Sequence, residues 1–417
     1  MTQNSTLQID RLAHKGDGVA INNGEQVFIA LTLPQELVEA EQVGSRFELN
    51  RIIEPSPERV EPICLHFGSC GGCTLQHASS TLYSAFKRQQ IIEALKSRGI
   101  EHPVEEVVPC PPQSRRRAVL TAVKAGHKIL MGYHGAKSHR LVDIKECPVL
   151  LPEITEALPN LRKLASKVIG RKGELKITVT STESGLDICL NGLGKNFEKY
   201  FLELSQDAME FSFARLTAEG ETVLELKKPN LHMGEVLVTP PSGGFLQATQ
   251  QAEDEMADLV LEGLNGCKKV IDLFAGSGTF TFRLAKQASV LAVESDAKSL
   301  KALDEAKRQA SKLKKVEVQR RDLFRRPLTK AEIYQFGKGY DGVVIDPPRS
   351  GALEQSKELA QSSVKRIVSV SCNPATFARD LKVLTDGNFK ITKIVPVDQF
   401  LYSPHVEVVA LLENTAN

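Results

Sequence analysis

The stretch KVIDLFAGSGT, residues 269–279, joins a short apolar run to a glycine-rich turn. The β-branched run is typical of a buried strand, and the two glycines allow backbone N–H groups to approach a ligand closely. More strand-like runs follow, separated by helical segments such as 297–313, and they cover residues 289–293, 316–319, 342–345 and 366–370. This alternation predicts a doubly wound parallel sheet, and the last runs, 390–397 and 406–412, are expected to close it as an antiparallel hairpin.

The chain before residue 244 has a different pattern. From residue 5 to about 55, short apolar runs alternate with Gly, Asn and Pro turns, which predicts a small antiparallel β-barrel. A helix is expected over 81–97, and short β-type runs between about 104 and 240 indicate a largely antiparallel α+β region. We therefore expect three domains: the barrel at 1–57, a central α+β domain at 58–243 and the α/β domain at 244–417.

Composition excludes several classes of protein. With 417 residues, 41% of them hydrophobic and 25% charged, the chain is long enough for two or three domains with their own cores. A net charge of +2 neither requires nor excludes a nucleic-acid partner. No run of about 18 apolar residues is present, and the polar start Met1-Thr2-Gln3-Asn4 lacks the apolar core of a secretory signal. We expect a cytoplasmic protein without membrane contact.

The glycine-rich turn favours one class of nucleotide ligand. A loop that binds the pyrophosphate of NAD or FAD would carry a third glycine near Thr281, and none is present. Glu294, after the next strand, is placed to accept hydrogen bonds from two ribose hydroxyls, and Asp322 to contact an adenine amino group. This pattern is typical of S-adenosylmethionine sites in class I methyltransferases. The alternative is that Glu294 and Asp322 only cap the helix starting at Ala297 and a loop, respectively.

Asp346-Pro347-Pro348-Arg349 ends the fourth strand of this region. The two prolines stiffen the backbone and leave few N–H groups to satisfy, so the position of Asp346 is expected to be fixed near the substrate. Methyltransferases that act on exocyclic amines carry an aromatic residue after the prolines, where it stacks on the base. Arg349 at this position argues against amine methylation.

Ser371-Cys372-Asn373-Pro374 places a thiol after the strand-like run 366–370. Open α/β sheets bind ligands in the crevice at the carboxyl ends of their strands, so Cys372 is expected to face that crevice. A cysteine after a strand is more often a small buried hydrophobe. The glycine-rich turn before it and Glu407 after it favour an active-site thiol instead.

One reaction requires both a thiol and a base. C5 of uracil is a poor nucleophile, but a thiolate that adds to C6 produces an enolate whose C5 attacks a methyl sulfonium. A base must then remove the C5 proton before the thiolate leaves. Cys372 would supply the thiol, with a pKa lowered by its surroundings, and Glu407 the carboxylate. For Glu407 alone, a solvated carboxylate at a strand start is the alternative; His405 is expected to be structural or orienting.

The cysteines are unevenly spaced. Eight in 417 residues are too few for a disulfide scaffold, and their clustering suggests metal binding or catalysis in a reducing compartment. Cys64-x5-Cys70-Gly-Gly-Cys73 brings three thiols close together, and Cys147 is a fourth candidate. Four thiolates fit either a [4Fe-4S] cluster or structural zinc, and spacing does not choose between them. The single cysteines are expected to be packing residues: Cys110, Cys189 and Cys267.

These motifs together resemble the RNA 5-methyluridine methyltransferase family. The matching stretches run through most of the chain: Cys64-x5-Cys70-Gly-Gly-Cys73-x2-Gln76-His77, Asp272 to Thr279, Asp346 to Arg349, Ser371 to Thr376, and His405-Val406-Glu407. The resemblance implies an α/β class I S-adenosylmethionine methyltransferase (Rossmann-like) C-terminal domain, a central α+β domain with an iron-sulfur cluster, and an N-terminal barrel similar to the TRAM, OB-like RNA-binding domain.

The resemblance also assigns residues. It implies Cys372 as nucleophile, Glu407 as base, and a [4Fe-4S] cluster held by Cys64, Cys70, Cys73 and Cys147. Contacts to the methyl donor S-adenosylmethionine are implied for Gln247, Phe274, Thr279, Glu294, Asp322 and Asp346. Two positions depart from the family pattern: Thr279 stands where Asn is usual, and 245–249 reads Phe-Leu-Gln-Ala-Thr where Phe-x-Gln-x-Asn is usual. Both changes keep a hydrogen-bonding side chain.

The substrate is expected to be RNA, because a thiol reaches C6 only when the uridine is unpaired or flipped out. Arg115-Arg116-Arg117, with Lys124 and Arg140, is a candidate phosphate surface; the alternative is a solvated charge run. Within the family, members that carry the cluster cysteines resemble ribosomal RNA enzymes, so 23S rRNA is preferred over tRNA. The rival hypotheses are a non-catalytic RNA-binding or ribosome assembly factor and a redox protein. No obligate protein partner is inferred.

Overall fold

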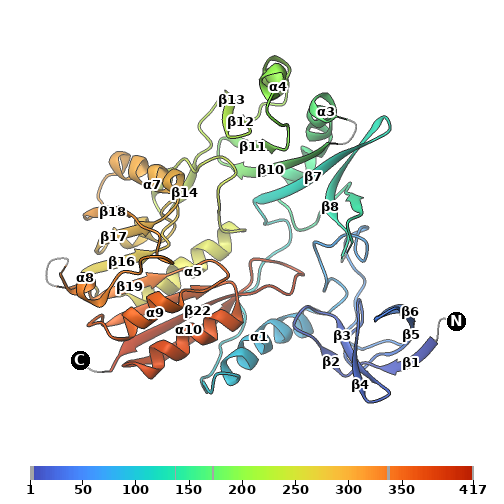
Figure 1. Cartoon of the computed structure of the whole chain (residues 1–417), viewed down its shortest axis with the longest axis horizontal. Coiled ribbons are helices and arrows are strands. Elements are labelled where there is room, and N and C mark those ends of the chain that lie inside the picture. The colour runs from blue at the N-terminus through green and yellow to red at the C-terminus, as the bar shows by residue number, and fades with distance from the viewer. Residues whose placement is uncertain (1–3, 137, 171–172, 336–338, 416–417) are drawn as a thin grey trace.

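The computed structural model describes residues 4–136, 138–170, 173–335 and 339–415 (Figure 1). Three large sheets follow one another along the chain, with six, seven and seven strands, and a two-stranded ribbon lies between the second and the third. The first three residues, on which the expectation about a secretory signal partly depends, lie outside the described residues. Within the described part of the chain, no helix combines the length and apolarity needed to cross a membrane.

The N-terminal sheet is built from short strands joined by tight turns. Its order is β1-β5-β6-β4-β3-β2, and every neighbouring pair is antiparallel except β4 with β6. The strands enclose a small apolar cluster that includes Ile9, Ile29 and Val38. The bounds are β1 Asn4–Gln8, β2 Arg11–Leu12, β3 Gly18–Asn22, β4 Glu25–Ile29, β5 Leu37–Val43 and β6 Arg46–Glu54.

The central sheet has the order β13-β12-β11-β10-β7-β8-β9, and only β11 and β12 run parallel. The helix α3 packs on it through Leu158, Leu161 and Leu164, which share one apolar cluster with the strands. The strands are β7 Arg117–Ala125, β8 Lys128–His134, β9 Leu141–Asp143, β10 Glu174–Thr182, β11 Gly185–Asn191, β12 Arg215–Ala218 and β13 Glu221–Glu225. The helices are α2 Pro152–Glu156, α3 Leu158–Val168, the 3-10 turn Phe197–Tyr200 and α4 Phe201–Glu210.

The C-terminal sheet has the order β18-β17-β16-β19-β20-β22-β21. The strands β16 to β20 are parallel, whereas β21 and β22 form the expected antiparallel hairpin. The strands are β16 Lys269–Leu273, β17 Ser289–Glu294, β18 Val316–Arg320, β19 Gly342–Ile345, β20 Arg366–Ser371, β21 Phe389–Val397 and β22 Glu407–Asn414, and the ribbon is β14 Leu231–Met233 with β15 Val236–Val238. The helices are α5 Gln250–Gly263, α6 Thr281–Leu284, α7 Ala297–Gln309, α8 Lys330–Gln335, α9 Leu353–Ala360 and α10 Pro374–Asp386.

The prediction of a doubly wound parallel sheet is confirmed by this order. One helix is shorter than expected: α7 ends at Gln309 rather than at residue 313, because Ala310 is already extended (ψ 140°) and the polar segment after it turns back toward β18. A hydrophobic layer covers each face of the sheet, one built around Ile271 and Val343 and the other around Val270 and Val344.

The helix α1 (Ser80–Lys96) packs against the C-terminal sheet. Ile91 and Leu95 share an apolar cluster with the strands of that sheet, and α1 lies beside α10 (Figure 1). The backbone N–H groups of Glu105 and Val108 donate to carbonyls of β21, at 2.9 Å in both cases. The segment 80–108, which the expected division assigns to the central domain, therefore packs on the C-terminal sheet, and the apolar face of α1 meets α10.

The register of the hairpin determines where the site lies. Val397 at the end of β21 pairs with Glu407 at the start of β22, and Ser371 at the end of β20 pairs with Val408. The loop 398–406 therefore leaves the sheet at the same edge as the carboxyl ends of β16, β19 and β20. Four loops that carry the expected site residues meet at this edge.

Candidate active site

Cys372 sits in a turn that is fixed on both sides. The side chain of Asn373 caps α10 by accepting from the N–H of Ala375 at 3.1 Å, and its amide donates to the carbonyl of Arg349 at 2.9 Å. Pro374 fits the first turn of α10, where a backbone N–H has no partner in the helix. The thiol is therefore held at the sheet edge between two loops.

The Cys372 thiol opens into a cavity of about 530 Å³. Arg349, Asn373 and His405 line it beside the cysteine, and His14 and Lys15 reach it from the N-terminal sheet. The pocket is thus shared by the first and last parts of the chain. Its size suits a flat heterocycle together with part of a sugar-phosphate strand.

The electrostatics of Cys372 differ from expectation. Burial, with the charges of Glu407 and Asp346, raises the pKa of the thiol to about 11, although Arg349 acts in the opposite direction through its charge and a hydrogen bond. The expected lowering of the pKa is therefore wrong for this arrangement of charges. Arg349 is the group that favours the thiolate, and a cationic ligand beside Asp346 would act in the same direction.

Glu407, the first residue of β22, is buried with 4% of its surface exposed. Its Oε1 accepts a hydrogen bond from Nε2 of Gln399 at 2.7 Å. Burial raises the pKa of its carboxyl to about 8, and the charge of Asp346 acts in the same direction. The alternative of a solvated carboxylate at a strand start is wrong, because the hairpin buries Glu407 at the sheet edge, directly after Val406 in the pocket wall.

Two further carboxyls lie at this edge. Asp346 accepts a hydrogen bond from Nε2 of the buried Gln247 at 3.2 Å, and burial raises its pKa to about 7. Asp272 accepts from the hydroxyl of Thr281 at 2.5 Å, and burial, reinforced by Asp346 and Glu294, raises its pKa to about 7. Among the described residues, the other oxygen of Asp272 has no hydrogen-bond partner. The edge therefore concentrates negative charge that a cation would neutralise.

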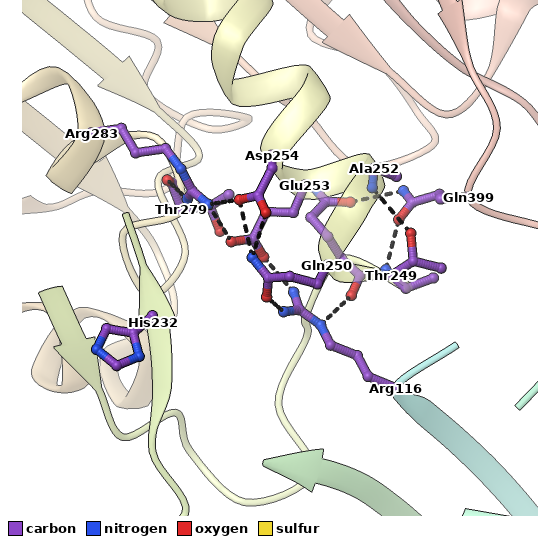
Figure 2. Close-up of polar contacts among 12 residues, drawn as sticks. Arg116, His232, Thr249, Gln250, Ala252, Glu253, Asp254, Thr279, Arg283 and Gln399 are labelled. Atoms are coloured by element: carbon purple, nitrogen blue, oxygen red, sulfur yellow. Dashed lines mark hydrogen bonds and ion pairs between the residues drawn. The ribbon is translucent and has the colours of Figure 1, made fainter. Parts of the chain in front are cut away.

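The glycine-rich loop leaves room above this charge. Phe274 has φ +63° and Gly276 φ +55°, and a Cβ at Gly276 would meet no atom within 4 Å. The N–H of Gly276 donates to Glu294 at 2.9 Å. The carbonyl of Thr279 accepts from Arg283 at 2.8 Å (Figure 2). The backbone of this loop is thus held open rather than packed.

The acid that ends β17 and the acid that follows β18 have different local roles. Glu294 does not cap α7; the side chain of Asp296 does, by accepting from the N–H of Ser299 at 2.7 Å. Asp322 accepts from the N–H of Phe324 at 3.0 Å and thereby stabilises its own turn. The helix-cap alternative for Glu294 is therefore wrong, whereas the loop-cap alternative for Asp322 matches its contacts.

Cys64, Cys70, Cys73 and Cys147 line a second cavity, of about 340 Å³. Burial raises the pKa of Cys73 to about 12, and the charges of the other three thiols add to this effect. Gly72 donates its N–H to the sulfur of Cys70 at 3.4 Å, and the N–H groups of Val149 and Leu150 point to Cys147. Among the described residues, no group of three or more His, Cys, Asp or Glu side chains is arranged so that it could hold a metal ion.

The loop 398–406 connects the two cavities. Phe400, Leu401, Ser403 and His405 also line the cysteine cavity. The N–H groups of Thr74 and Leu75, directly after Cys73, donate to the carbonyl of Tyr402 at 2.8 and 3.0 Å. The cysteine segment and the loop that precedes Glu407 are therefore joined through the backbone.

The chain is similar in sequence to known RNA methyltransferases. It is 45% identical over 415 residues to an RNA methyltransferase of Agrobacterium fabrum, an overlap of 98% of this chain and 99% of that protein. It is 32% identical over 427 residues to the 23S rRNA (uracil(1939)-C(5))-methyltransferase RlmD of Pectobacterium atrosepticum, an overlap of 98% and 93%. Residues 231–415 match the family described as tRNA (Uracil-5-)-methyltransferase.

The chain belongs to the RNA uracil-5-methyltransferase family. This confirms the resemblance inferred from the motifs. The fold is similar to that of the tRNA (uracil-54, C5)-methyltransferase of Pyrococcus abyssi, solved with S-adenosyl-L-homocysteine, with a TM-score of 0.76 and 24% identity over 98% of this chain and 99% of that one. The C-terminal sheet is therefore that of a class I methyltransferase.

The arginine run of this family member is not a continuous phosphate surface. Arg116 is buried, and its guanidinium contacts Gln250 and Glu253 of α5 (Figure 2). Arg115 is half-buried above the ring of Phe400, 5.6 Å from its centre. Alternate residues of an extended segment point to opposite sides, so three adjacent arginines cannot all face one ligand.

Sequence reasoning missed several residues of the site. Gln399 is 2% exposed and contacts Glu407 directly. Lys87 of α1 is fully buried and donates to Asp398 at 2.5 Å, as does the hydroxyl of Tyr83 at 2.7 Å. The sequence did hold one signal: Asp398 and Gln399 are polar and directly follow the β21 run, and the hairpin turn brings this position close to Glu407 at the start of β22.

The buried carboxyls make stability depend on pH. A carboxyl whose pKa is raised in the folded state stabilises the fold below its ordinary pKa, and this contribution is lost as pH rises through the raised value. For Glu407 we expect the loss between pH 4.5, the ordinary pKa, and about pH 8, the raised one. Glu407→Gln should therefore lose less unfolding free energy than the wild type across this range in urea denaturation. An equal loss of unfolding free energy in the wild type and in Glu407→Gln would contradict the burial of charge at Glu407. So would an equally small loss in the exposed control Glu413→Gln.

Proposed function

We propose that this protein methylates C5 of a uridine in RNA, with S-adenosylmethionine as methyl donor, Cys372 as nucleophile and Glu407 as base. One observation carries the proposal: a thiol at the end of β20 and a buried carboxylate at the start of β22 lie at one sheet edge, beside the pocket of about 530 Å³. A structural cysteine would not require a carboxylate with a raised pKa beside it.

Cys372 begins the reaction. It loses its proton to solvent, and the thiolate, stabilised by Arg349, adds to C6 of the uracil. The C5–C6 double bond opens, and its electrons move onto C5 and O4 as an enolate. Arg349 lies 2.8 Å from Nδ1 of His405, whose pKa is lowered to about 4 by partial desolvation and by the charge of Arg349. A neutral imidazole therefore accepts from the guanidinium and orients it.

Glu407 completes the reaction. When bound, S-adenosylmethionine supplies an electrophilic methyl group on a sulfonium, which C5 attacks, while the donor sulfur keeps the bonding electrons. C5 then carries both a hydrogen and a methyl group. Glu407 takes the proton, the C5–C6 double bond forms again, and the bond from C6 to the sulfur of Cys372 breaks.

The described residues fit this donor. Asp272, Glu294 and Asp346 gather negative charge at the sheet edge, which suits the sulfonium and ammonium of S-adenosylmethionine. The unpartnered oxygen of Asp272 and the open space above Gly276 supply a polar contact and room. We assign donor contacts to Gln247, Phe274, Thr279, Glu294, Asp322 and Asp346.

The RNA is proposed to bind across the N-terminal and C-terminal parts of the chain. His14 and Lys15 line the pocket of Cys372, which supports an RNA-binding role for a TRAM-like barrel at 1–57. The central α+β domain at 58–243 and the methyltransferase domain at 244–417 would complete the surface. The relative named for 23S rRNA supports ribosomal RNA over tRNA. Cytoplasmic location stays a prediction.

The four cysteines are proposed to hold a [4Fe-4S] cluster. Their thiols are the ligands that such clusters use, and N–H groups directed at Cys70 and Cys147 are the hydrogen bonds that cluster sulfurs accept. Gly71 cannot be replaced without disturbance, because a Cβ there would lie 2.7 Å from the carbonyl of His134. The cluster would stabilise the segment that binds the loop 398–406, and no step of the reaction passes through it.

Anaerobically purified protein is expected to be brown, with about four iron atoms and matching sulfide per chain. Cys73→Ser should lose most of the iron and should increase hydrogen exchange in the loop 398–406, because Thr74 and Leu75 hold Tyr402. Cys189→Ser, a buried cysteine of β11, is the matched control and should keep its iron. Colourless protein with stoichiometric zinc, or iron retained in Cys73→Ser, would contradict the cluster assignment.

The function is tested by mapping 5-methyluridine in RNA from cells that lack this protein. We expect one or more 5-methyluridines of 23S rRNA to disappear, and to return when the protein and S-adenosylmethionine are added to that rRNA. If 5-methyluridine disappeared from tRNA alone, the substrate would be tRNA and the proposed reaction would still hold. Unchanged 5-methyluridine in all RNA, with no transfer in vitro, would overturn the proposed function.

A further inference from the structure

We propose that Gln399 is a positioning residue that holds Glu407 in the orientation and charge state needed to remove the C5 proton. The inference rests on the proposed function, because it gives a second residue a part in the elimination step. Gln399 lies two residues after β21 in the loop 398–406, and its side chain is 2% exposed. It contacts Glu407 and Gln247 but not the pocket that receives the uracil.

The orientation of the Gln399 amide is fixed by a backbone donor. The N–H of Ala248 lies 2.6 Å from one end of the amide, and a backbone N–H can only donate, so that end is the carbonyl oxygen. The NH2 group must then face the other two neighbours. It donates to Oε1 of Glu407 at 2.7 Å and to Oε1 of Gln247 at 2.8 Å. All polar atoms of Gln399 are thereby used.

The amide of Gln247 is oriented in the same way. Gln247 accepts from Gln399 with its oxygen, so its NH2 group faces Asp346, 3.2 Å away. A directed chain of hydrogen bonds therefore runs from Gln399 in one direction to the base Glu407 and in the other to the acid Asp346. The carboxylates of Glu407 and Asp346 are thus held by two linked amides.

This chain leaves Glu407 one oxygen for catalysis. Oε1 is occupied by a donor that has no acceptor lone pair to offer, so a proton on that oxygen would break the contact. The other oxygen is the one available to receive the C5 proton. Burial and the charge of Asp346 favour protonation of Glu407, and the hydrogen bond from Gln399 opposes it. The charges of Arg349 and Lys87 also favour the carboxylate. The Cys372 thiol lies close enough to interact with Glu407.

Both ends of the Gln399 contact are anchored. Asp398 is bound by Lys87 of α1 at 2.5 Å, which fixes the start of the loop. Ala248 is held from the other side, because its carbonyl accepts from the N–H of Arg116 at 2.9 Å. Figure 2 shows Gln399 beside Thr249 at the start of α5, with Arg116 reaching the same segment. The donor that orients Gln399 is therefore a fixed part of the fold.

The test compares Gln399→Leu with Gln355→Leu. Gln355 is an equally buried glutamine, 1% exposed, whose amide bonds both backbone groups of Leu328, so its loss matches the structural effect without touching Glu407. Methyl transfer to unmodified RNA is measured against pH at saturating donor and RNA, and the covalent RNA-protein adduct is quantified on denaturing gels.

For Gln399→Leu we expect turnover to fall by about 10-fold to 100-fold and adduct to accumulate. The midpoint of the acidic limb of the pH profile, where activity rises as Glu407 loses its proton, should move up by about one unit. Gln355→Leu should keep the wild-type midpoint and show no adduct. Gln399→Glu, which keeps the shape and can donate at most one hydrogen bond, should also accumulate adduct, so the test stands if the leucine variant does not fold.

A wild-type midpoint and no adduct in both Gln399 variants would overturn this inference while leaving the proposed function intact. Failure of the proposed function looks different: wild-type protein would then make no 5-methyluridine, and Glu407→Gln would trap no RNA.

Discussion

Cys372→Ala is expected to abolish methyl transfer, with a loss on the order of a thousand-fold or more. Without the sulfur, nothing adds to C6, and C5 stays too poor a nucleophile to attack a methyl sulfonium. Affinity for S-adenosylmethionine should stay within about threefold of the wild type, because the acids and glycines of the proposed donor site are untouched. Radiolabelled methyl transfer and calorimetric donor titration measure the two quantities.

Cys267→Ala is the matched control for this variant. Cys267 is a buried cysteine of the C-terminal domain, whereas Cys372 is partly exposed. Cys267 lies just before β16, at the opposite edge of the sheet, near the carbonyl of Asp341 at 3.6 Å. It should keep wild-type turnover. If Cys372→Ala retained activity, or lost donor affinity in proportion to turnover, Cys372 would be a structural residue.

Glu407→Gln is expected to convert the enzyme into a trap for its RNA. Addition and methyl transfer do not need the carboxylate, whereas elimination does, so a methylated adduct should accumulate and multiple turnover should fall by about 10²-fold to 10⁴-fold. The amide keeps the shape of the side chain, and its oxygen can still accept from Gln399. A shifted band that survives heating in denaturant measures the adduct.

The control for this variant lies on the same strand. Glu413 is near the far end of β22 and forms an exposed ion pair with Arg366 at 3.5 Å, so Glu413→Gln should turn over normally and trap nothing. If Glu407→Gln released product at the wild-type rate, another group would have to remove the C5 proton. Adduct that lacks the new methyl group would place Glu407 before methyl transfer instead.

Most of the C-terminal fold could be predicted from the sequence, because its strands are short β-branched runs that a parallel sheet buries on both faces. The runs at 269–274 and 366–370 lie within a residue of β16 and β20. The partner of α1 could not be predicted in this way. Periodicity shows that a helix has an apolar face, but not which sheet that face meets. Lys87 also interrupts the apolar pattern of α1, and its burial is possible because it pairs with Asp398.

Site residues could be predicted where a local motif identifies them, but not where their properties depend on contacts with residues distant in sequence. Cys372 and Asp346 follow strands and are recognisable from their neighbours in sequence. The direction of the pKa shift of Cys372 could not be predicted, because it depends on Glu407 and Asp346, which are distant in sequence and close in space. Gln399 could not be identified as a partner of Glu407 either, since its role comes from the N–H of Ala248, 151 residues away. Arg116 appeared to belong to a cationic run and is instead paired with Glu253.

The central claim is that a sulfur atom of Cys372 bonds to C6 of the substrate uracil. RNA that carries 5-fluorouridine at the target position tests it directly, because Glu407 cannot remove fluorine as a cation and the methylated adduct cannot break down. Mass spectrometry of the digested complex is expected to find a fluorinated, methylated nucleotide on the peptide that contains Cys372. Methyl transfer to ordinary RNA without any such adduct, or an adduct on a different residue, would contradict the account.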